Sequence, residues 1–286
     1  MYRKKELQSE RFPESMKLLV EIAKEAGHEA EWIDRWSGGL VRINGKYFGS
    51  GFFPKYPLNS ATSRQLVKDK TYAYMLLEEA KIKVPNGDYF FRFDQKYIGQ
   101  IQGKGMDEAR QWANDHGYPV FVKPNQGALG RNCFKVSDEE ELLICLEKIF
   151  IDDYMVLVQE VLEGKEYRVM FVDSEIVLIY EKSRAYERVN GKKKYVSDVA
   201  NLSSGGVLVG EIGEWTLELA VLVKKIAQIF GLRYGGIDLM GGEINSVDDL
   251  TVLEVNSDPG LDHFLAHDLE KGKQIMKKLL RASWRE

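Results

Sequence analysis

Two apolar runs near the C-terminus, each interrupted by a carboxylate, restrict the fold more than any other feature of the sequence. Residues 234–240 read Tyr-Gly-Gly-Ile-Asp-Leu-Met, and residues 250–256 read Leu-Thr-Val-Leu-Glu-Val-Asn. Because side chains alternate along a strand, Glu254 and Asn256 share one face, and Leu253 and Val255 share the other. The linker is short and polar, which predicts a β-hairpin that brings Asp238 beside Glu254 and Asn256.

These three side chains offer the oxygen ligands that suit a hard divalent cation. Magnesium prefers oxygen ligands and is commonly shared between a few protein groups and nucleotide phosphates. Asp238, Glu254 and Asn256 are therefore candidate ligands for Mg2+, with Mn2+ as an alternative. A hydrogen-bonded polar patch or a solvated sheet face would explain the same spacing, and spacing alone does not separate these interpretations.

The rest of the chain mixes helical periodicity with the signals of antiparallel turns. Apolar residues recur at helical spacing in residues 73–80 and 219–229. The pairs Asp173–Ser174 and Asn190–Gly191 each lie between extended runs and are typical of tight turns. The early part of the chain shows only one helix, in residues 16–26. The sequence therefore predicts an α+β fold.

Composition and charge narrow the range of partners. The chain has 286 residues, 44% hydrophobic and 29% charged, as in an ordinary globular protein. A formal net charge of −4, with both signs interspersed, gives no general attraction for nucleic acid or an anionic membrane. The first residues lack the apolar stretch of a signal peptide or a membrane span, and Cys133 and Cys145 indicate free thiols. We therefore expect a cytoplasmic protein without nucleic-acid or membrane partners.

The residues after the second apolar run point to a family. Residues 256–260 read Asn-Ser-Asp-Pro-Gly, and a glycine there lets a backbone N–H approach a ligand closely. An acidic residue, an apolar residue, Asn and then a small-Pro-Gly turn resemble the final motif of the ATP-grasp superfamily. Upstream, Lys70 opens a helix, and Lys123 follows an apolar strand and precedes the Gly-rich residues 125–131, in the order of that superfamily. The resemblance extends over residues 67–268.

The resemblance implies a fold and a set of nucleotide contacts. It implies two α+β lobes that clasp ATP, with the phosphates held by lysines beneath a mobile Gly-rich lid and the adenosine held at the hinge. The implied nucleotide contacts are Lys70 and Lys123 at the phosphates, Gln159, Glu160 and Leu162 at the adenine, Glu166 at the ribose, and Arg184 at the transferring phosphoryl group, with Asn201 as a further contact of the nucleotide. Gln159 stands where some members have an acidic residue.

The resemblance also implies an activity. The segments around Arg184 and Asn201 are similar to the branches that contain ribosomal-protein glutamate ligases, cyanophycin synthetase and D-alanine–D-alanine ligases. Such ligases activate a carboxylate as an acyl phosphate and join it to an amine. The implied catalytic groups are Lys123 and Arg184, which stabilise phosphate charge, and the Gly260 N–H, which meets the oxyanion with Arg184. The implied substrates are a small-molecule or peptide carboxylate and an amine.

Two alternatives to a ligase remain open. An ATP-grasp kinase would phosphorylate a hydroxyl group and form no amide. A noncatalytic ATP-binding module would bind the nucleotide without turnover, although Asp238, Glu254, Asn256 and Arg184 together count against it.

We expect three regions along the chain. Residues 1–66 form a short N-terminal region, a reduced form of the domain that precedes the ATP-grasp lobes in many members. Residues 67–158 form the first lobe with the Gly-rich lid, and residues 159–286 form the second lobe with the metal site. Since the first region is short, a partner protein or a second copy of the chain could complete the substrate pocket.

Overall fold

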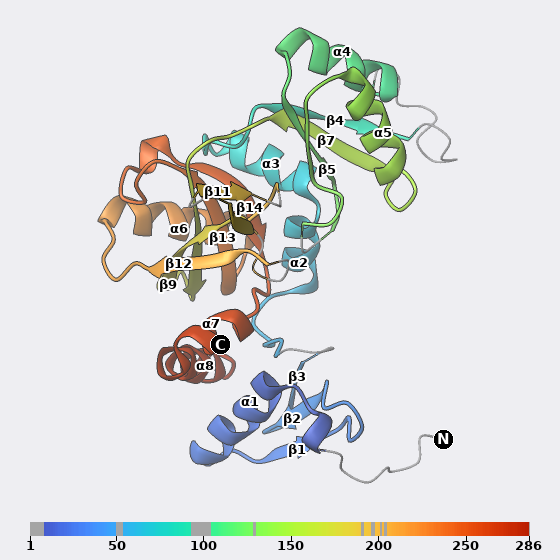
Figure 1. Ribbon diagram of the computed structural model, residues 1–286. Helices are drawn as coiled ribbons and strands as arrows, with labels where there is room; N and C mark the ends of the chain where they lie inside the picture. Colours follow the sequence, from blue (N-terminus) through green and yellow to red (C-terminus); the bar gives the residue numbers. More distant parts are fainter. Residues whose placement is uncertain are drawn as a thin grey trace.

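The chain folds into three parts that are stacked along one direction (Figure 1). One lobe carries a four-stranded sheet, and a second carries a five-stranded sheet. A small N-terminal lobe packs beneath the C-terminal helices α7 (Asp262–His267) and α8 (Leu269–Ala282). The computed structural model describes residues 9–49, 54–92, 104–127, 130–189, 192–195, 198–200, 202 and 205–285, with the backbone alone for residues 187–189 and 192–194. The predicted α+β fold is confirmed.

The first lobe is a sheet with two helices on one face. Its strand order is β4-β7-β5-β6, and all neighbours are antiparallel. On β5, Val120 and Val122 pack beneath the helices, so Phe121 and Lys123 face the opposite way because strand side chains alternate. The elements are β4 Gly87–Phe91, α4 Met106–His116, β5 Val120–Pro124, β6 Phe134–Val136, α5 Glu139–Ile149 and β7 Met155–Glu160.

The second lobe is an antiparallel sheet in the order β12-β9-β8-β13-β14. One face packs against α3 and α6 through residues such as Val169 and Ile237. The opposite face is divided along β8: Met170 and Val172 join the core beneath α8, while Arg168 faces the first lobe. The elements are α3 Lys70–Glu79, β8 Lys165–Val172, β9 Glu175–Ser183, β12 Val207–Glu211, α6 Leu217–Phe230, β13 Tyr234–Gly241, η3 Val247–Asp249 and β14 Thr251–Asn256.

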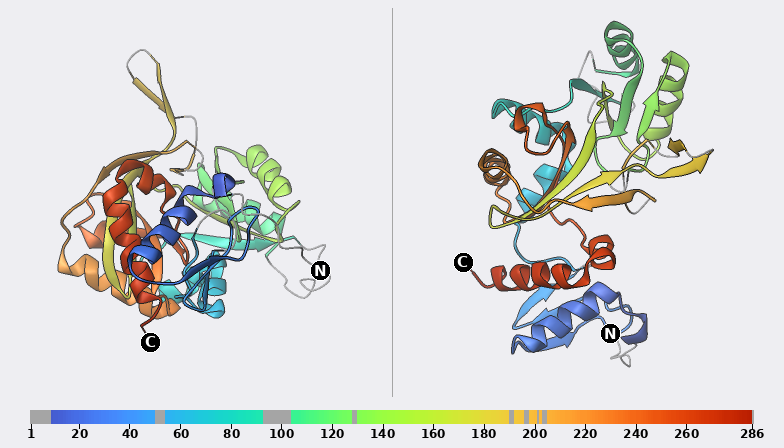
Figure 2. Two further views of the ribbon diagram at one scale, coloured as in Figure 1. Left: turned by 90° about the horizontal axis from the view of Figure 1, so that it is seen from below. Right: turned by 60° about the vertical axis from the view of Figure 1, so that its left-hand side comes forward.

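Local signals predicted several of these elements correctly. The β8–β9 hairpin turns at Asp173 and Ser174, which have φ of 50° and 66°. Gly231 ends α6 with φ of 62°, a left-handed conformation that glycine adopts without strain. The predicted Asn190–Gly191 turn lies outside the described residues, although β10 Tyr186–Val189 and β11 Lys192–Tyr195 on either side are antiparallel and project from the lobe (Figure 2).

The N-terminal lobe contains more structure than the sequence indicated. Besides the expected helix it holds three strands, which were missed because each has only three residues and shows no periodicity. Its core is continuous with α8 and with the back of β8 and β9. The elements here and at the C-terminus are η1 Ser9–Arg11, α1 Glu14–Glu25, β1 Ala30–Trp32, β2 Val41–Ile43, β3 Lys46–Phe48, α2 Ala61–Lys68, α7 Asp262–His267 and α8 Leu269–Ala282.

The division of the chain into three regions stays a prediction. The first sheet ends at Glu160 and the second begins at Lys165, yet α3 packs on the second sheet. Among the described residues, no helix is both long and apolar enough to cross a membrane.

Candidate active site

A cavity of about 970 Å3 lies between the first and second sheets. Its lining comes from β5, the hinge at residues 159–164, the cavity face of the second sheet, and the turn after β14. The structure brings together at this cavity every sequence-predicted site residue that it describes: Lys70, Lys123, Gln159, Glu160, Leu162, Glu166, Arg184, Asp238, Glu254, Asn256 and Gly260. Asn201 lies outside the described residues.

The predicted hairpin of β13 and β14 is confirmed, with one difference in its register. Asp238 pairs directly with Glu254, and Asn256 lies opposite Gly236. The ladder then skips Leu253, because Leu239 pairs with Val252. This bulge turns Leu253 towards the cavity instead of the core face that simple alternation predicted, which is the usual effect of one extra residue in a strand.

Asp238 belongs to a buried network of four charged side chains. Arg168 Nη2 donates to Asp238 Oδ2 at 2.8 Å, and Lys182 Nζ lies 3.1 Å from Asp238 Oδ1 and 2.6 Å from a carboxylate oxygen of Glu166. Burial opposes ionisation of Asp238, but Arg168 and Lys182 outweigh it and hold the pKa of this carboxyl below its usual value. Burial also raises the pKa of Glu166, in spite of Lys182.

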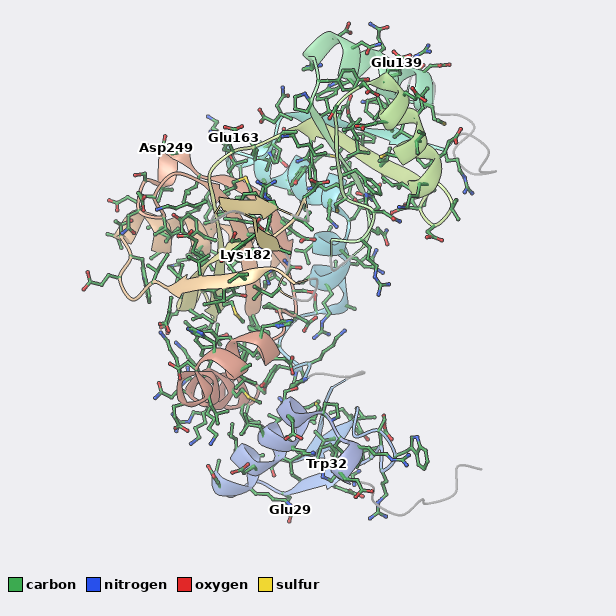
Figure 3. All side chains as sticks on the ribbon, viewed as in Figure 1. Glu29, Trp32, Glu139, Glu163, Lys182 and Asp249 are labelled. Carbon is green, nitrogen blue, oxygen red and sulfur yellow. The ribbon has the colours of Figure 1, made fainter. Side chains whose placement is uncertain are left out.

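Sequence reasoning missed Arg168 and Lys182. Both line the cavity from the second lobe. Figure 3 shows Lys182 in the second sheet, with α7 and α8 between it and Trp32 of the N-terminal lobe. Strand alternation was a usable signal for Arg168, since Arg168 follows Glu166 by two residues on β8. Its pairing with Asp238 depends on the order of the strands, which short-range patterns do not specify.

The donor set near Glu254 fits a magnesium ion that is shared with phosphate. Glu254 and Asn256 both line the cavity. The buried Nδ2 of Asn256 has no hydrogen-bond partner, and as an N–H donor it suits a phosphate oxygen, while the amide Oδ1 is the atom suited to Mg2+. Among the described residues, Glu254 pairs with Lys70 Nζ at 3.2 Å. No cluster of three or more His, Cys, Asp or Glu side chains suited to a metal occurs among the described residues. Two carboxylates and an amide leave room for phosphate oxygens in an octahedral shell.

Lys123 of the first lobe faces Asp238, Glu254 and Asn256 across the cavity, and no described carboxylate pairs with it. Its Nζ donates to the Tyr74 hydroxyl at 2.8 Å, and that hydroxyl donates to the carbonyl of the bulged Leu253 at 2.7 Å. Lys123 is only 6% exposed, and burial lowers the pKa of its ammonium group. In the part of the chain that the structure describes, no carboxylate lies within ion-pair distance of it. Such a cation is suited to an anionic ligand.

The profile of the RimK-like ATP-grasp domain matches residues 67–282 of this chain. The chain belongs to the RimK-like ATP-grasp family. It is 31% identical over 144 residues to a D-alanine–D-alanine ligase of Haemophilus ducreyi, an alignment that covers 50% of this chain and 45% of that enzyme. It is 23% identical to a cyanophycin synthetase of Synechocystis, over 68% of this chain and 28% of that protein. The chain thus spans less than half the length of these relatives.

Solved structures share the ATP-grasp fold. A bifunctional glutathione synthetase from Pasteurella multocida superposes with a TM-score of 0.58 at 15% identity, over 94% of this chain and 44% of that one. A D-alanine–D-alanine ligase from Bacillus anthracis gives 0.56 at 21% identity, over 79% of this chain and 68% of that one.

The hinge of this ATP-grasp chain offers one unused polar group. Gln159 is only 4% exposed, and its Oε1 has no hydrogen-bond partner. Glu160 is occupied elsewhere, because its side chain accepts from the Asn86 N–H at 2.8 Å and its own N–H donates to the Asn86 carbonyl at 2.8 Å. Leu162 lines the cavity in the connection between the two sheets. Gln159 is therefore the hinge side chain that best fits a polar ligand edge.

Two further predicted ATP-grasp site residues, Arg184 and Gly260, line the cavity from the second lobe. Arg184 follows β9, and its guanidinium carbon lies 4.3 Å from the centre of the Tyr195 ring. Gly260 lies in the turn after β14. A Cβ atom at Gly260 would meet Asp262 Oδ2 at 3.5 Å, an ordinary contact, so the protein's own packing does not require glycine there. A requirement for glycine at this position would come from a ligand.

Proposed function

We propose that this chain is an ATP- and magnesium-dependent ligase that joins a carboxylate to an amine and releases ADP and phosphate. The observation that carries the proposal is the cavity in which the ammonium of Lys123, which pairs with no described carboxylate, faces Asp238, Glu254 and Asn256. Cations for phosphate and oxygen ligands for Mg2+ are the two groups that phosphoryl transfer requires. The D-alanine–D-alanine ligase and cyanophycin synthetase among the relatives favour amino acids or peptides as substrates.

Each cavity residue would act through charge and position. Lys70 and Lys123 would bind the phosphates, and Glu254, Asn256 and Asp238 would hold Mg2+, which neutralises phosphate charge when it is bound. The substrate carboxylate oxygen attacks the γ-phosphorus as the bond to ADP breaks, which gives an acyl phosphate. The amine then attacks the acyl carbon, loses a proton, and phosphate leaves.

Arg184 and the turn after β14 would stabilise the charge that develops in these two steps. Arg184 would offset the charge of the transferring phosphoryl group, because a guanidinium binds phosphate oxygens with two parallel hydrogen bonds. The Gly260 N–H would donate to the oxyanion that forms during attack by the amine. Gln159 and Leu162 would contact the adenine and Glu166 the ribose.

The test is phosphate release from ATP and Mg2+ with pooled carboxylates and amines, for the wild type and Glu254→Gln. We expect release that requires both substrate classes, a product whose mass is the sum of the two substrates minus water, and loss of release in the variant. A phosphorylated hydroxyl compound would instead identify a kinase. Bound ATP without turnover for any pair would identify a binding module and contradict the proposal.

A further inference from the structure

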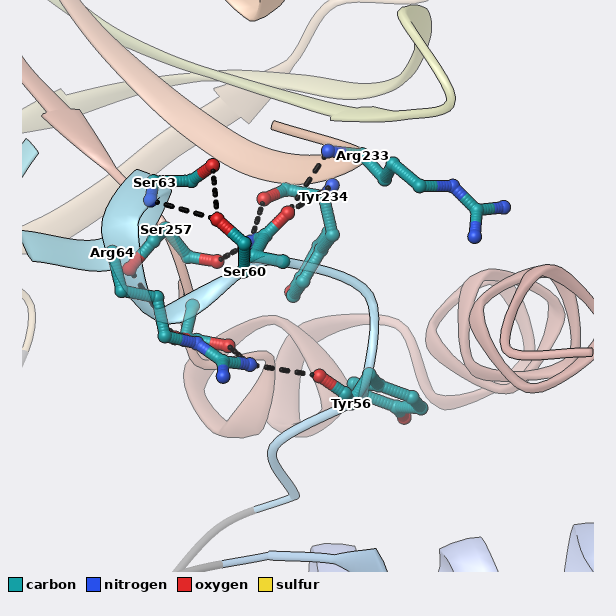
Figure 4. Close-up of polar contacts among 9 residues, drawn as sticks. Tyr56, Ser60, Ser63, Arg64, Arg233, Tyr234 and Ser257 are labelled. Atoms are coloured by element: carbon teal, nitrogen blue, oxygen red, sulfur yellow. Dashed lines mark hydrogen bonds and ion pairs between the residues drawn. The ribbon is translucent and has the colours of Figure 1, made fainter. Parts of the chain in front are cut away.

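The connector between the N-terminal lobe and α2 contacts the turn after β14, residues 257–260, which lines the active-site cavity. This connector, residues 54–60, and the first turn of α2 precede the matched ATP-grasp domain. Neither Asn59 nor Arg64 lines the cavity. Both side chains reach the turn of residues 257–260, whose Asp258, Pro259 and Gly260 do line it (Figure 4).

Asn59 uses all of its hydrogen-bonding capacity to join this turn to β13. Its Oδ1 accepts from the N–H groups of Arg233 at 2.9 Å and Tyr234 at 3.2 Å. Its Nδ2 donates to the carbonyls of Tyr234 at 2.6 Å and Ser257 at 2.5 Å. Two donors and two acceptors are the full capacity of a carboxamide, so any other side chain would leave buried backbone groups unsatisfied.

Arg64 holds the next residue of the turn through a bidentate ion pair. Its Nε lies 2.9 Å from Asp258 Oδ2 and its Nη2 lies 3.2 Å from Asp258 Oδ1, while Nη2 also donates to the Tyr56 carbonyl at 3.0 Å. The Tyr234 hydroxyl donates to the Pro259 carbonyl at 2.5 Å. Three consecutive residues of the turn, Ser257 to Pro259, are thus each held from outside the cavity.

We propose that Asn59 and Arg64 are positioning residues that hold the 257–260 turn in the geometry that ligation requires. The inference rests on the proposed function, in which the Gly260 N–H meets the oxyanion and the preceding Asn256 holds Mg2+. Effective catalysis needs such groups within a fraction of an ångström of their productive positions. Arg64 also neutralises Asp258, a carboxylate that lines the cavity where phosphate would be transferred.

The experiment compares Arg64→Met with Arg233→Met, a closely matched control. Arg233 forms the same bidentate pair, with Asp173 at 2.8 and 3.2 Å, and also donates to the Ala282 carbonyl. The Arg233 side chain is 34% exposed and the Arg64 side chain is 35% exposed. Arg233→Met keeps the backbone N–H of residue 233, which donates a hydrogen bond to Asn59 Oδ1. Both variants should therefore lose similar thermal stability.

The kinetic results should differ between the two variants. We expect Arg64→Met to lower the kcat of ligation by about tenfold or more while the Kd for ATP with Mg2+ changes by less than about twofold. Arg233→Met should keep the wild-type kcat. Amide hydrogen exchange in the peptide that contains residues 258–261 should become faster in Arg64→Met alone. An unchanged kcat in Arg64→Met, or an equal loss in both variants, would overturn the inference.

A double variant tests whether Arg64 acts through Asp258. We expect Arg64→Met added to Asp258→Asn to lower kcat no further than Asp258→Asn alone, whereas independent effects would multiply. Multiplying effects would contradict the proposed route. Amide hydrogen exchange can be measured without turnover, so it separates this inference from the proposed function. A wild type that shows no ligation would contradict the proposed function. Whether Arg64 holds the 257–260 turn would then be decided by the exchange rates of wild type and Arg64→Met alone.

Discussion

The two sheets that line the cavity differ in how their buried charged side chains are paired. On the second sheet, Asp238 and Glu166 are already paired with Arg168 and Lys182, so each charge has a partner of opposite sign. On the first sheet, Lys123 is equally buried, but among the described residues it contacts the hydroxyl and ring of Tyr74 and no carboxylate at ion-pair distance. The second sheet thus pairs its buried charges directly, whereas Lys123 has a place for the negative charge of a ligand.

This difference separates structural from ligand-directed charge. A buried ion pair costs stability when one partner is removed, because the other charge stays in a poorly solvated site. A buried ammonium without a counter-charge costs stability as it stands, and binding of an anion relieves that cost. The network of Asp238, Arg168, Lys182 and Glu166 on the second sheet should therefore respond to substitution in the free protein, and Lys123 of the first sheet should respond mainly when nucleotide is present.

The largest effect on stability is expected for Asp238→Asn. The substitution leaves Lys182 paired with Glu166 but leaves Arg168 without a described carboxylate at ion-pair distance, so we expect the free energy of unfolding to fall by about 3 kcal/mol or more. Urea denaturation of the ligand-free protein measures it. Glu254→Gln is the control, because Glu254 is 30% exposed and should change stability by about 1 kcal/mol or less. Equal effects of the two variants would show that the buried network around Asp238 contributes no more to stability than the partly exposed pair of Glu254 and Lys70.

The next largest effect is expected for Lys123→Met, in ligand binding. Charge-assisted hydrogen bonds to phosphate contribute about 1.5–3 kcal/mol, so the affinity for ATP should fall by about tenfold to hundredfold. The free protein should be at least as stable as the wild type, since a desolvated charge is removed. Isothermal titration with ATP and Mg2+ measures the first quantity and urea denaturation the second. A destabilised variant that binds ATP normally would show that Lys123 is structural.

The second sheet shows how much of the site the sequence could predict. Asp238, Glu254 and Asn256 come from one hairpin, so alternation and a short linker were enough to bring them together. Arg168 and Asp238 are 70 residues apart, and their contact depends on β8 lying beside β13. Local periodicity carries no information about such strand order.

Small irregularities set a second limit on prediction from the sequence. The bulge at Leu253 reverses one side chain relative to ideal alternation, and it frees the carbonyl that Tyr74 binds. The strands of the N-terminal lobe are three residues each, so they rest on pairing with one another and on α1 rather than on a recognisable pattern. The Asn59 and Arg64 contacts likewise join segments almost two hundred residues apart, as their separations of 198 and 194 show.

A smaller effect is expected in the pH dependence of Lys123→Met. Burial holds the pKa of Lys123 below its ordinary value of 10.5. Between the lowered pKa and 10.5 the unfolded chain binds more protons than the folded protein, so the contribution of Lys123 to the free energy of unfolding rises with pH. Any stability advantage of the variant should therefore shrink as pH rises towards about 10. Urea midpoints of both proteins across this range measure it, and a constant difference would contradict the buried, charged state of Lys123.

The smallest effect on stability is expected for a substitution of Asp34 in the N-terminal lobe. This substitution tests whether a charge in that lobe influences ATP binding in the cavity. Asp34 accepts hydrogen bonds from the N–H groups of Trp36, Ser37 and Gly39, and although burial opposes it, these bonds and the Ser37 hydroxyl lower its pKa to about 2. A lowered carboxyl pKa adds stability above its ordinary value of 3.8, and that stability is lost as pH falls towards about 2.

Asp34→Asn should therefore lower stability at neutral pH by about 1 kcal/mol or less, because Asp34 is only partly buried, and the difference from the wild type should vanish by about pH 2. Thermal unfolding between these pH values measures the change. The affinity for ATP should stay at the wild-type value, since no described residue of this lobe lines the cavity. A loss of ATP affinity in Asp34→Asn would instead mean that the N-terminal lobe influences the site, through the connector that carries Asn59.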